Sequence, residues 1–307
     1  MQETNIVRNI AIIGHGNCGK TSLAEAMLFT AGKINRLGKV DDGTAAMDYE
    51  DEEISRKISI NTCFHNYSWK KHDIYLMDTP GDDNFLNDTM FAAHVADGAL
   101  FTIGAVLGVK GQTIKFANII KDQGLPTVIA INKMDRERAD FQKTVDQITE
   151  SLPLKPVVIH LPIGAEENFK GYVDLVSEKA YLFDGNSGKV QETEIPGELA
   201  DEVSSLREVL MENVADSDDE LIEKFLEEGE LTNEDIVTGL RTAVKNGMIA
   251  PICVCSATEN KGTAPILDIV NDLMPSPADR KPVTATAGDG EELIEIKPSS
   301  DEPFSAL

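Results

Sequence analysis

The sequence predicts an α/β fold in which a mostly parallel sheet carries helices on both faces, together with an inserted α+β subdomain. Three observations indicate this class. Short apolar runs alternate with helix-length segments, which is typical of parallel strands joined by helices. A glycine-rich loop separates the first apolar run from the first helix-like segment. The alternation stops near residue 156 and resumes near residue 248.

Composition excludes several classes of protein. The chain has 307 residues, and its hydrophobic share of 41% is enough to build substantial cores. No apolar run reaches the length of about 18 residues that crosses a bilayer, and residues 1–8 lack the pattern of a secretion signal. We therefore expect a cytoplasmic protein without a membrane segment. The formal net charge of −25 disfavours direct, non-specific binding of a phosphate backbone.

The acidic charge is concentrated in two segments. Residues 191–240 carry 17 acidic and two basic side chains, and residues 41–53 carry seven acidic and no basic ones. Either segment is a candidate for recruiting a basic partner. For the first segment, a helix face in contact with water is the simpler interpretation.

The N-terminal elements follow one another in a simple order. Residues 7–13 form an apolar, β-branched run that predicts a buried strand, and apolar side chains at helical spacing over 23–31 predict the next helix. Residues 35–56 lack periodicity, which predicts a long mobile loop. Apolar and polar residues alternate over 58–65, and a lysine pair then precedes the apolar run 74–77. These two runs predict an antiparallel hairpin.

The later apolar runs extend the same sheet. Residues 99–106 and 126–131 predict two further buried strands, each separated from the next by a helix-length segment. Residues 249–255 predict another strand, and 265–274 predict the helix that closes the domain.

These patterns define an expected division of the chain. The first domain comprises residues 1–155 and 248–278, and residues 156–247 form the inserted α+β subdomain, with short strands before acidic helices. Residues 279–307 are rich in Pro, Thr, Ser and acidic side chains, which predicts a linker. The last five residues, 303–307, look like the beginning of a strand, so we expect the chain to be truncated there.

The segment from Gly14 to Ser22 matches a phosphate-binding loop and lies between a predicted strand and a predicted helix, as its mechanism requires. Glycines allow backbone N–H groups to turn onto phosphate oxygens, and the helix start adds partial positive charge. Lys20 adds a full charge, and the Thr21 hydroxyl can bind Mg²⁺. The residues expected to contact nucleotide are Gly14, His15, Gly16, Asn17, Cys18, Gly19, Lys20, Thr21 and Ser22.

Asp78 and Gly81 follow the second strand of the predicted hairpin. In the context of the phosphate loop, Asp78 is placed to hold a water molecule on Mg²⁺, and the Gly81 N–H is placed to meet the terminal phosphate. Lys20 and Gly81 are therefore the groups expected to assist phosphate chemistry.

Asn132, Lys133 and Asp135 follow the predicted strand 126–131, at the edge where open α/β sheets bind ligands. A carboxylate at Asp135 can accept from both the ring N–H and the amino group of guanine, a donor pair that adenine lacks. The apolar stem of Lys133 can cover the base. Ser256 and Ala257 follow the last strand and could add backbone N–H donors. An ATP-using enzyme is accordingly the least favoured alternative.

This ordered set of motifs, completed by Arg56–Ile60, resembles the translational GTPases, and bacterial elongation factor G most closely. The resemblance covers the whole chain and includes an insertion within the GTPase domain. It implies GTP or GDP and Mg²⁺ as cofactors, with Ser59 as a magnesium ligand. It also implies a monomer that acts with the ribosome in elongation or translocation. By the same resemblance, the end of 279–307 is the start of a truncated β-barrel domain, which further domains would follow.

Among the departures from the family pattern, Asp82 and Lys57 bear most on hydrolysis and loop closure, whereas Asn17 and Cys18 replace the family's usual pair in the phosphate loop. Asp82 occupies the place of the histidine that positions the attacking water, and Lys57 replaces a flexible glycine. An aspartate beside phosphate should repel it, take up a proton or point away. We therefore expect slow hydrolysis, as in an elongation factor G-like paralogue. The alternatives are a non-hydrolysing, nucleotide-gated binding module and a ribosome-protection or stress GTPase.

The cysteines and two histidines have competing interpretations. Cys253 and Cys255 fit one face of a buried strand better than a metal site. Cys18, at a helix start, is either a small loop residue or a thiol of lowered pKa that oxidises and blocks the nucleotide. For His15 and His94, structural roles are expected.

Overall fold

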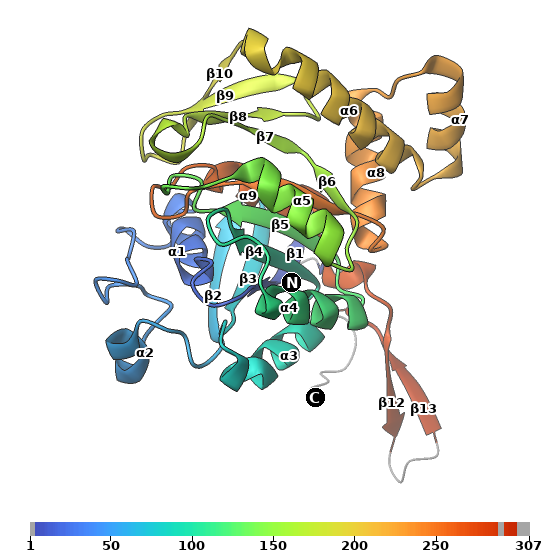
Figure 1. The fold of residues 1–307 in the computed structure, drawn as a ribbon. Helices are drawn as coiled ribbons and strands as arrows, with labels where there is room; N and C mark the ends of the chain where they lie inside the picture. Colours follow the sequence, from blue (N-terminus) through green and yellow to red (C-terminus); the bar gives the residue numbers. More distant parts are fainter. Residues whose placement is uncertain (1–3, 288–291, 300–307) are drawn as a thin grey trace.

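A seven-stranded sheet forms the centre of the computed structural model, which describes residues 4–287 and 292–299 (Figure 1). Its strand order is β2-β3-β1-β4-β5-β11-β6. β2 (Cys63–Trp69) and β3 (His72–Asp78) form the predicted antiparallel hairpin, and the other neighbours are parallel. The parallel strands are β1 (Val7–Ile13), β4 (Gly98–Gly104), β5 (Thr127–Asn132), β11 (Ala250–Val254) and β6 (Pro156–Val158).

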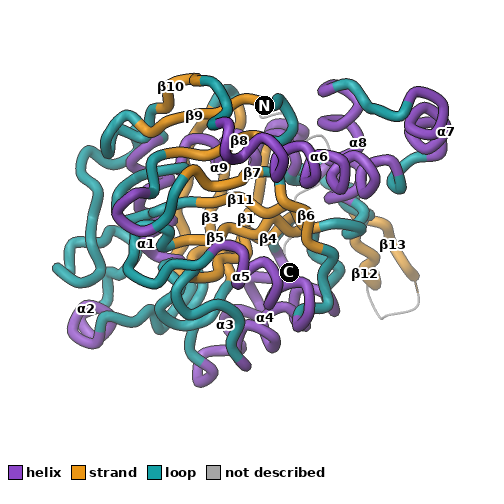
Figure 2. The backbone as a smooth tube through the Cα atoms, turned by 45° about the horizontal axis from the view of Figure 1, so that its top comes forward, coloured by secondary structure: helices purple, strands orange, loops and turns teal. Residues whose placement is uncertain are grey.

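Helices enclose this sheet, which confirms the predicted α/β class (Figure 2). Every residue of β4, β5 and β11 is buried, so both faces of the central strands are covered. α1 packs beside α9, and α3 packs beside α4. The helices around the sheet are α1 (Lys20–Thr30), α3 (Leu86–Val95), α4 (Gly111–Asp122), α5 (Phe141–Ser151) and α9 (Thr263–Leu273). Short 3₁₀ turns occur at η1 (Thr4–Ile6), η2 (Asp83–Phe85), η3 (Glu166–Asn168), η4 (Gly197–Leu199) and η5 (Pro277–Asp279).

The segment between α1 and β2 differs from its prediction in two respects. The expected loop 35–56 ends in a short helix, α2 (Asp51–Arg56), and the expected strand at 58–65 begins only at Cys63. The buried Glu53 carboxylate explains the late start, since it accepts hydrogen bonds from the backbone N–H groups of Ile60 and Asn61, at 2.8 and 3.1 Å. These amides are therefore used before the strand ladder begins.

The insertion contains an antiparallel sheet of four strands in the order β10-β9-β8-β7, with three helices after it in the chain (Figure 1). The sequence places residues 156–158 in this insertion, but they form β6 and pair with β11 of the central sheet. The elements of the insertion are β7 (His160–Ile163), β8 (Gly171–Asp174), β9 (Lys179–Phe183), β10 (Val190–Thr193), α6 (Ala200–Ala215), α7 (Asp219–Glu228) and α8 (Asn233–Lys245).

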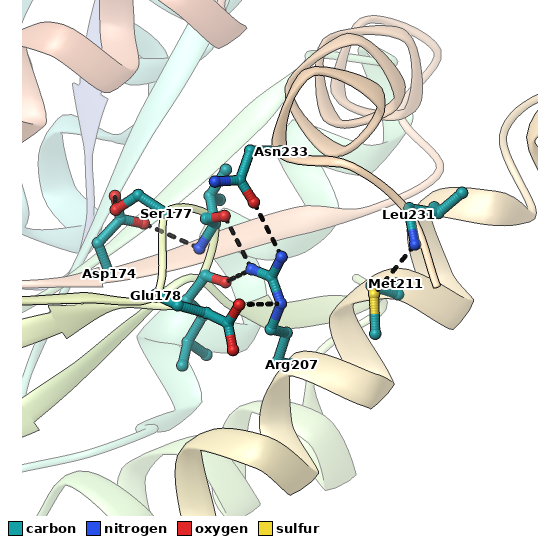
Figure 3. Close-up of polar contacts among 9 residues, drawn as sticks. Asp174, Ser177, Glu178, Arg207, Met211, Leu231 and Asn233 are labelled. Atoms are coloured by element: carbon teal, nitrogen blue, oxygen red, sulfur yellow. Dashed lines mark hydrogen bonds and ion pairs between the residues drawn. The ribbon is translucent and has the colours of Figure 1, made fainter. Parts of the chain in front are cut away.

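Arg207 of α6 joins the helices of the insertion to its sheet (Figure 3). Its guanidinium donates hydrogen bonds to the carbonyl oxygens of Leu175 and Val176 and, at 2.9 Å, to the side chain of Asn233. It also forms an ion pair with Glu178 at 3.2 Å. Because Arg207 is buried, these four acceptors compensate for the loss of hydration.

The C-terminal segment is not a simple linker. β12 (Val283–Ala287) and β13 (Glu292–Ile296) pair as an antiparallel hairpin that projects from the rest of the molecule (Figure 1). The predicted strand beginning at 303–307 lies outside the described residues. Among the residues that the structure describes, no helix is both long enough and apolar enough to cross a membrane. Cys253 lies in β11 and Cys255 directly follows it, both fully buried, as the strand interpretation predicts.

His160 makes the stability of the fold depend on pH. The imidazole is buried against Tyr172, with ring centroids 4.3 Å apart, and burial lowers the pKa of His160 to about 4. Unfolding restores the ordinary pKa of about 6.5, so this contribution to stability is present above pH 6.5 and is lost as the pH falls towards 4.

Substitution of His160 by phenylalanine should reduce the loss of stability between pH 7 and pH 5 by about 2 kcal/mol, because the ring stacking remains and the titration does not. Denaturant unfolding of both proteins at the two pH values measures this difference. An identical pH dependence in the variant would show that His160 does not contribute.

Candidate nucleotide-binding site

The phosphate-binding loop lies between β1 and α1, as predicted, and its backbone requires glycine at two positions. Gly19 has a φ angle of 93°, and a Cβ there would lie 2.5 Å from the Asn132 side-chain nitrogen. A Cβ on Gly14 would collide with the carbonyl oxygen of Thr102 in β4. Asn17 also adopts a left-handed conformation, with φ of 65°. The loop is therefore wrapped tightly against the ends of the neighbouring strands.

Lys20 and Gly81 meet at this loop, as the sequence predicts. Lys20 is buried at the start of α1, and its ammonium group donates to the His15 carbonyl oxygen at 3.3 Å. A Cβ on Gly81 would collide with that ammonium group and would lie 2.8 Å from the backbone nitrogen of Gly16. Ser22 lies in the first turn of α1 and is half-buried. The backbone after β3 thus lies directly against the phosphate loop.

The predicted metal ligands converge beside the loop, together with one residue that the sequence did not single out. The Thr21 and Ser59 hydroxyl oxygens are 3.0 Å apart, and Ser59 donates to a carboxylate oxygen of Asp48 at 2.9 Å. Asp78 is buried and lies within hydrogen-bonding range of Thr21. Asp48 lies among the seven acidic residues of segment 41–53, and nothing in the sequence distinguishes it from the other six.

The electrostatics of this cluster fit a small divalent cation. One oxygen of Asp78 and one of Asp48 are buried and have no hydrogen-bond partner within the described part of the chain. Burial raises the pKa of Asp78 to about 7, against the opposing effects of Lys20 and Thr21, and burial also raises the pKa of Asp48. Two carboxylates and two hydroxyls form an all-oxygen donor set, which hard cations such as Mg²⁺ prefer.

The base end of the site is organised by Asn132. Its side-chain nitrogen donates to the carbonyl oxygens of Cys18 and Gly19, at 3.1 and 3.3 Å, which ties it to the phosphate loop. Its side-chain oxygen accepts from the backbone N–H groups of Lys133 and Ala257, at 2.8 and 3.0 Å. This amide therefore connects three motifs that are far apart in the sequence.

Asp135 offers an acceptor at the same end. One carboxylate oxygen lies 3.3 Å from Arg136 Nε, whereas the other is buried and unpaired in the portion of the chain described. Lys133 has a left-handed φ angle of 66°, and its side chain passes close to Gly19. An unpaired carboxylate oxygen next to an apolar lysine stem fits a base that presents N–H donors.

Ser256 and Ala257, which are predicted to offer backbone N–H donors to the base, lie in a loop that contacts Asn132. Their N–H groups also have acceptors within the chain: Ser256 donates to the Lys261 carbonyl at 2.9 Å, and Ala257 donates to Asn132. The reason is the tight turn between Ser256 and Lys261, which pair as an isolated β-bridge. These amides hold the loop and Asn132 in position.

The Asp82 side chain is fixed by hydrogen bonds within the turn that follows it. One carboxylate oxygen accepts from both the backbone and the side chain of Asn84, at 2.9 and 2.7 Å, and caps η2. The next residue, Asp83, forms an ion pair with Lys115 at 2.6 Å. The Asp82 carboxylate therefore has its hydrogen-bond donors within this turn.

The structure also bears on the predictions for Cys18, His15 and His94. The hypothesis of a reactive Cys18 is wrong, because the thiol is fully buried and burial raises its pKa. His15 is buried with Nδ1 3.1 Å from the Thr113 hydroxyl, and burial together with nearby lysines lowers its pKa to about 4. His94 is exposed, with Nδ1 3.4 Å from Gln123. His15 is accordingly a neutral part of the loop.

Comparison with known proteins places this site in a family. A family model described as the elongation factor Tu GTP binding domain matches residues 5–276. The fold also matches the crystal structure of a protein from Thermus thermophilus, with a TM-score of 0.84 and 25% sequence identity. That match covers 96% of this chain and 51% of the Thermus chain, so this chain spans about half of that protein. The chain belongs to the elongation factor Tu GTP binding domain family.

Proposed function

We propose that this chain is the GTP- and Mg²⁺-dependent switch of an elongation factor G-like protein, which acts as a monomer with the ribosome in the cytoplasm during elongation or translocation. The observation that carries the guanine assignment is the unpaired, buried oxygen of Asp135 beside Asn132. Adenine would leave this carboxylate without its pair of donors. The likeness to elongation factor G supports the ribosomal part of the proposal.

The proposed switch comprises residues 35–60 and 79–95. Bound Mg²⁺ would neutralise charge between the outer phosphates, held by Thr21 and Ser59 with Asp78 acting through water. Ser59 and the Gly81 N–H respond to the terminal phosphate, so its loss releases both segments.

Two buried carboxylates give the first switch segment discrete anchors. Glu25 of α1 accepts from the backbone N–H groups of Gly38 and Met47, at 3.2 and 3.0 Å, and Glu53 holds the residues around Ser59. Each anchor makes local hydrogen bonds that must break together when the segment opens. Opening of the segment would therefore require the hydrogen bonds of both anchors to break.

A second candidate function is a nucleotide-gated binding module that does not hydrolyse GTP. The hydrogen bonds from Asn84 to Asp82 favour it, because they engage the side chain that occupies the water-positioning place. Nucleotide binding uses other residues and is common to both candidates.

Equilibrium binding of GDP and ADP, with and without Mg²⁺, tests the proposal. We expect GDP to bind at least about 100-fold more tightly than ADP, since the wrong base leaves Asp135 unpaired.

An Asp48→Asn variant tests the metal site. It should need about 10- to 100-fold more Mg²⁺ for the same increase in GDP affinity, and its GDP affinity in the presence of a chelator should be unchanged. Asp51→Asn, an exposed carboxylate nearby, is the matched control. Equal affinity for GDP and ADP would refute the guanine assignment.

A further inference from the structure

Two turns of the insertion contact the two loops that are proposed to read the base. The first turn joins β7 to β8 and contains Glu166. The backbone N–H of Glu166 donates to the carbonyl oxygen of Met134 at 2.9 Å, and its carboxylate accepts from the backbone N–H of Arg138 at 2.7 Å. Both partners lie in the loop that carries Asp135. Glu166 is therefore hydrogen-bonded to this loop on both sides of Asp135.

The second turn joins β9 to β10 and is hydrogen-bonded to the other loop, which follows β11 and contains Ala257, Glu259 and Asn260. The Asn186 side chain donates to Glu259 at 3.0 Å, and the Asn260 side chain donates to the Asn186 carbonyl oxygen at 3.4 Å. Asn260 is fully buried and also accepts from the Thr30 hydroxyl at the end of α1, at 2.9 Å. Ala257 lies in the same loop as Glu259 and Asn260, and its backbone N–H donates to Asn132. The second turn is therefore connected to the base site through this loop.

Backbone conformation indicates that these contacts hold the loops in an otherwise unfavourable form. Lys133, Arg138, Glu166 and Asn260 all have left-handed φ angles, of 66°, 67°, 56° and 49°. A non-glycine residue in this region costs about 1 kcal/mol or more and persists where surrounding contacts maintain it. Three of these residues, Arg138, Glu166 and Asn260, make the bonds between the insertion and the loops.

We infer that the insertion positions both guanine-reading loops, so that its two turns set the rate of nucleotide dissociation and the preference for guanine. Glu166 and Asn186 are positioning residues in this scheme. The inference rests on the proposed guanine-nucleotide binding and extends it to the insertion. A partner that displaces the insertion sheet would release nucleotide without touching it.

The test measures dissociation of a fluorescent GDP analogue, together with the affinities for GDP and IDP, on the full chain. IDP lacks the 2-amino group that Asp135 reads, so the ratio of the two affinities reports the position of Asp135. We expect Glu166→Ala to speed dissociation about tenfold and to lower the preference for GDP over IDP. Glu166→Gln retains an acceptor for Arg138 and should stay within about twofold of the natural protein. Glu167→Ala, at an exposed neighbour, is the matched control.

Asn260→Asp tests the second turn independently, because it keeps the acceptor for Thr30 and removes the donor to Asn186. It should also speed dissociation. Unchanged dissociation in both Glu166→Ala and Asn260→Asp would overturn the inference. Equal losses of GDP and IDP affinity with a lowered Tm would also overturn it, because that pattern indicates general destabilisation. Failure of the natural protein to bind GDP would instead refute the proposed function.

Discussion

An Asp135→Asn variant is expected to bind GDP at least about 100-fold more weakly than the natural protein. The two carboxylate oxygens of Asp135, one of which is buried and unpaired within the described residues, would accept from the two N–H donors of guanine. A hydrogen bond to a charged group contributes about 1.5–3 kcal/mol, so loss of the charge on both contacts gives at least this factor. Equilibrium titration with GDP and XDP measures the change.

The same variant should gain affinity for XDP, because the asparagine amide can donate to the carbonyl that xanthine carries in place of the amino group. Arg136→Gln is the control, since it removes only the partly exposed contact at 3.3 Å and should alter GDP affinity less than about threefold. Parallel losses of GDP and XDP affinity in Asp135→Asn would show that the substitution disrupts the loop and leave base reading by Asp135 unsupported.

An Asp82→His variant is expected to hydrolyse GTP at least about 100-fold faster in the presence of ribosomes, measured under single-turnover conditions with the full-length protein. Asp82 provides no group that can donate a hydrogen bond to water when ionised, and its carboxylate caps η2 through Asn84. Histidine supplies a donor and removes one negative charge from the place that the family resemblance assigns to the water-positioning group. Loss of the cap on η2 should lower the free energy of unfolding by about 1 kcal/mol. Nucleotide binding uses other residues and should not depend on this cap.

Asp83→His places the same side chain one residue away and serves as the control for charge alone. Rapid hydrolysis by the natural protein would contradict the interpretation, because another group would then position the water. Slow hydrolysis by both the natural protein and Asp82→His, with tight GTP binding, would favour the nucleotide-gated binding module.

Short-range pattern accounts for the parts of the site that the sequence predicted. The phosphate loop needs glycine where φ is positive or the backbone is crowded, and Gly14 and Gly19 meet those conditions. Strand periodicity predicted Asp78 and Asn132 at the ends of buried strands, and the parallel arrangement of β3, β1, β4 and β5 then places both residues at the same edge of the sheet. Such features depend on neighbours in the chain and on general rules for parallel sheets.

The features that escaped prediction depend on contacts between distant segments. Asp48 joins the proposed metal site only because Ser59, 11 residues further along the chain, donates a hydrogen bond to it. In the sequence, Asp48 is one of seven acidic residues between positions 41 and 53, and nothing sets it apart from the other six. The late start of β2 follows from the capture of two amides by Glu53. The turn that gives the Ser256 amide its acceptor and the bond from the Ala257 amide to Asn132 also depend on distant residues, so the sequence does not indicate them.

The pairing of β6 with β11 gives the insertion a topological role. These strands are parallel and adjacent, so everything from residue 159 to residue 249 is the crossover that carries the chain from the end of one back to the start of the other. Parallel neighbours need a return path of a dozen or more residues, usually a helix, and α8 beside α9 provides its last part. The sheet and helices of the insertion are thus an enlargement of an obligatory connection, and a shortened version must keep α8 for β11 to retain its direction.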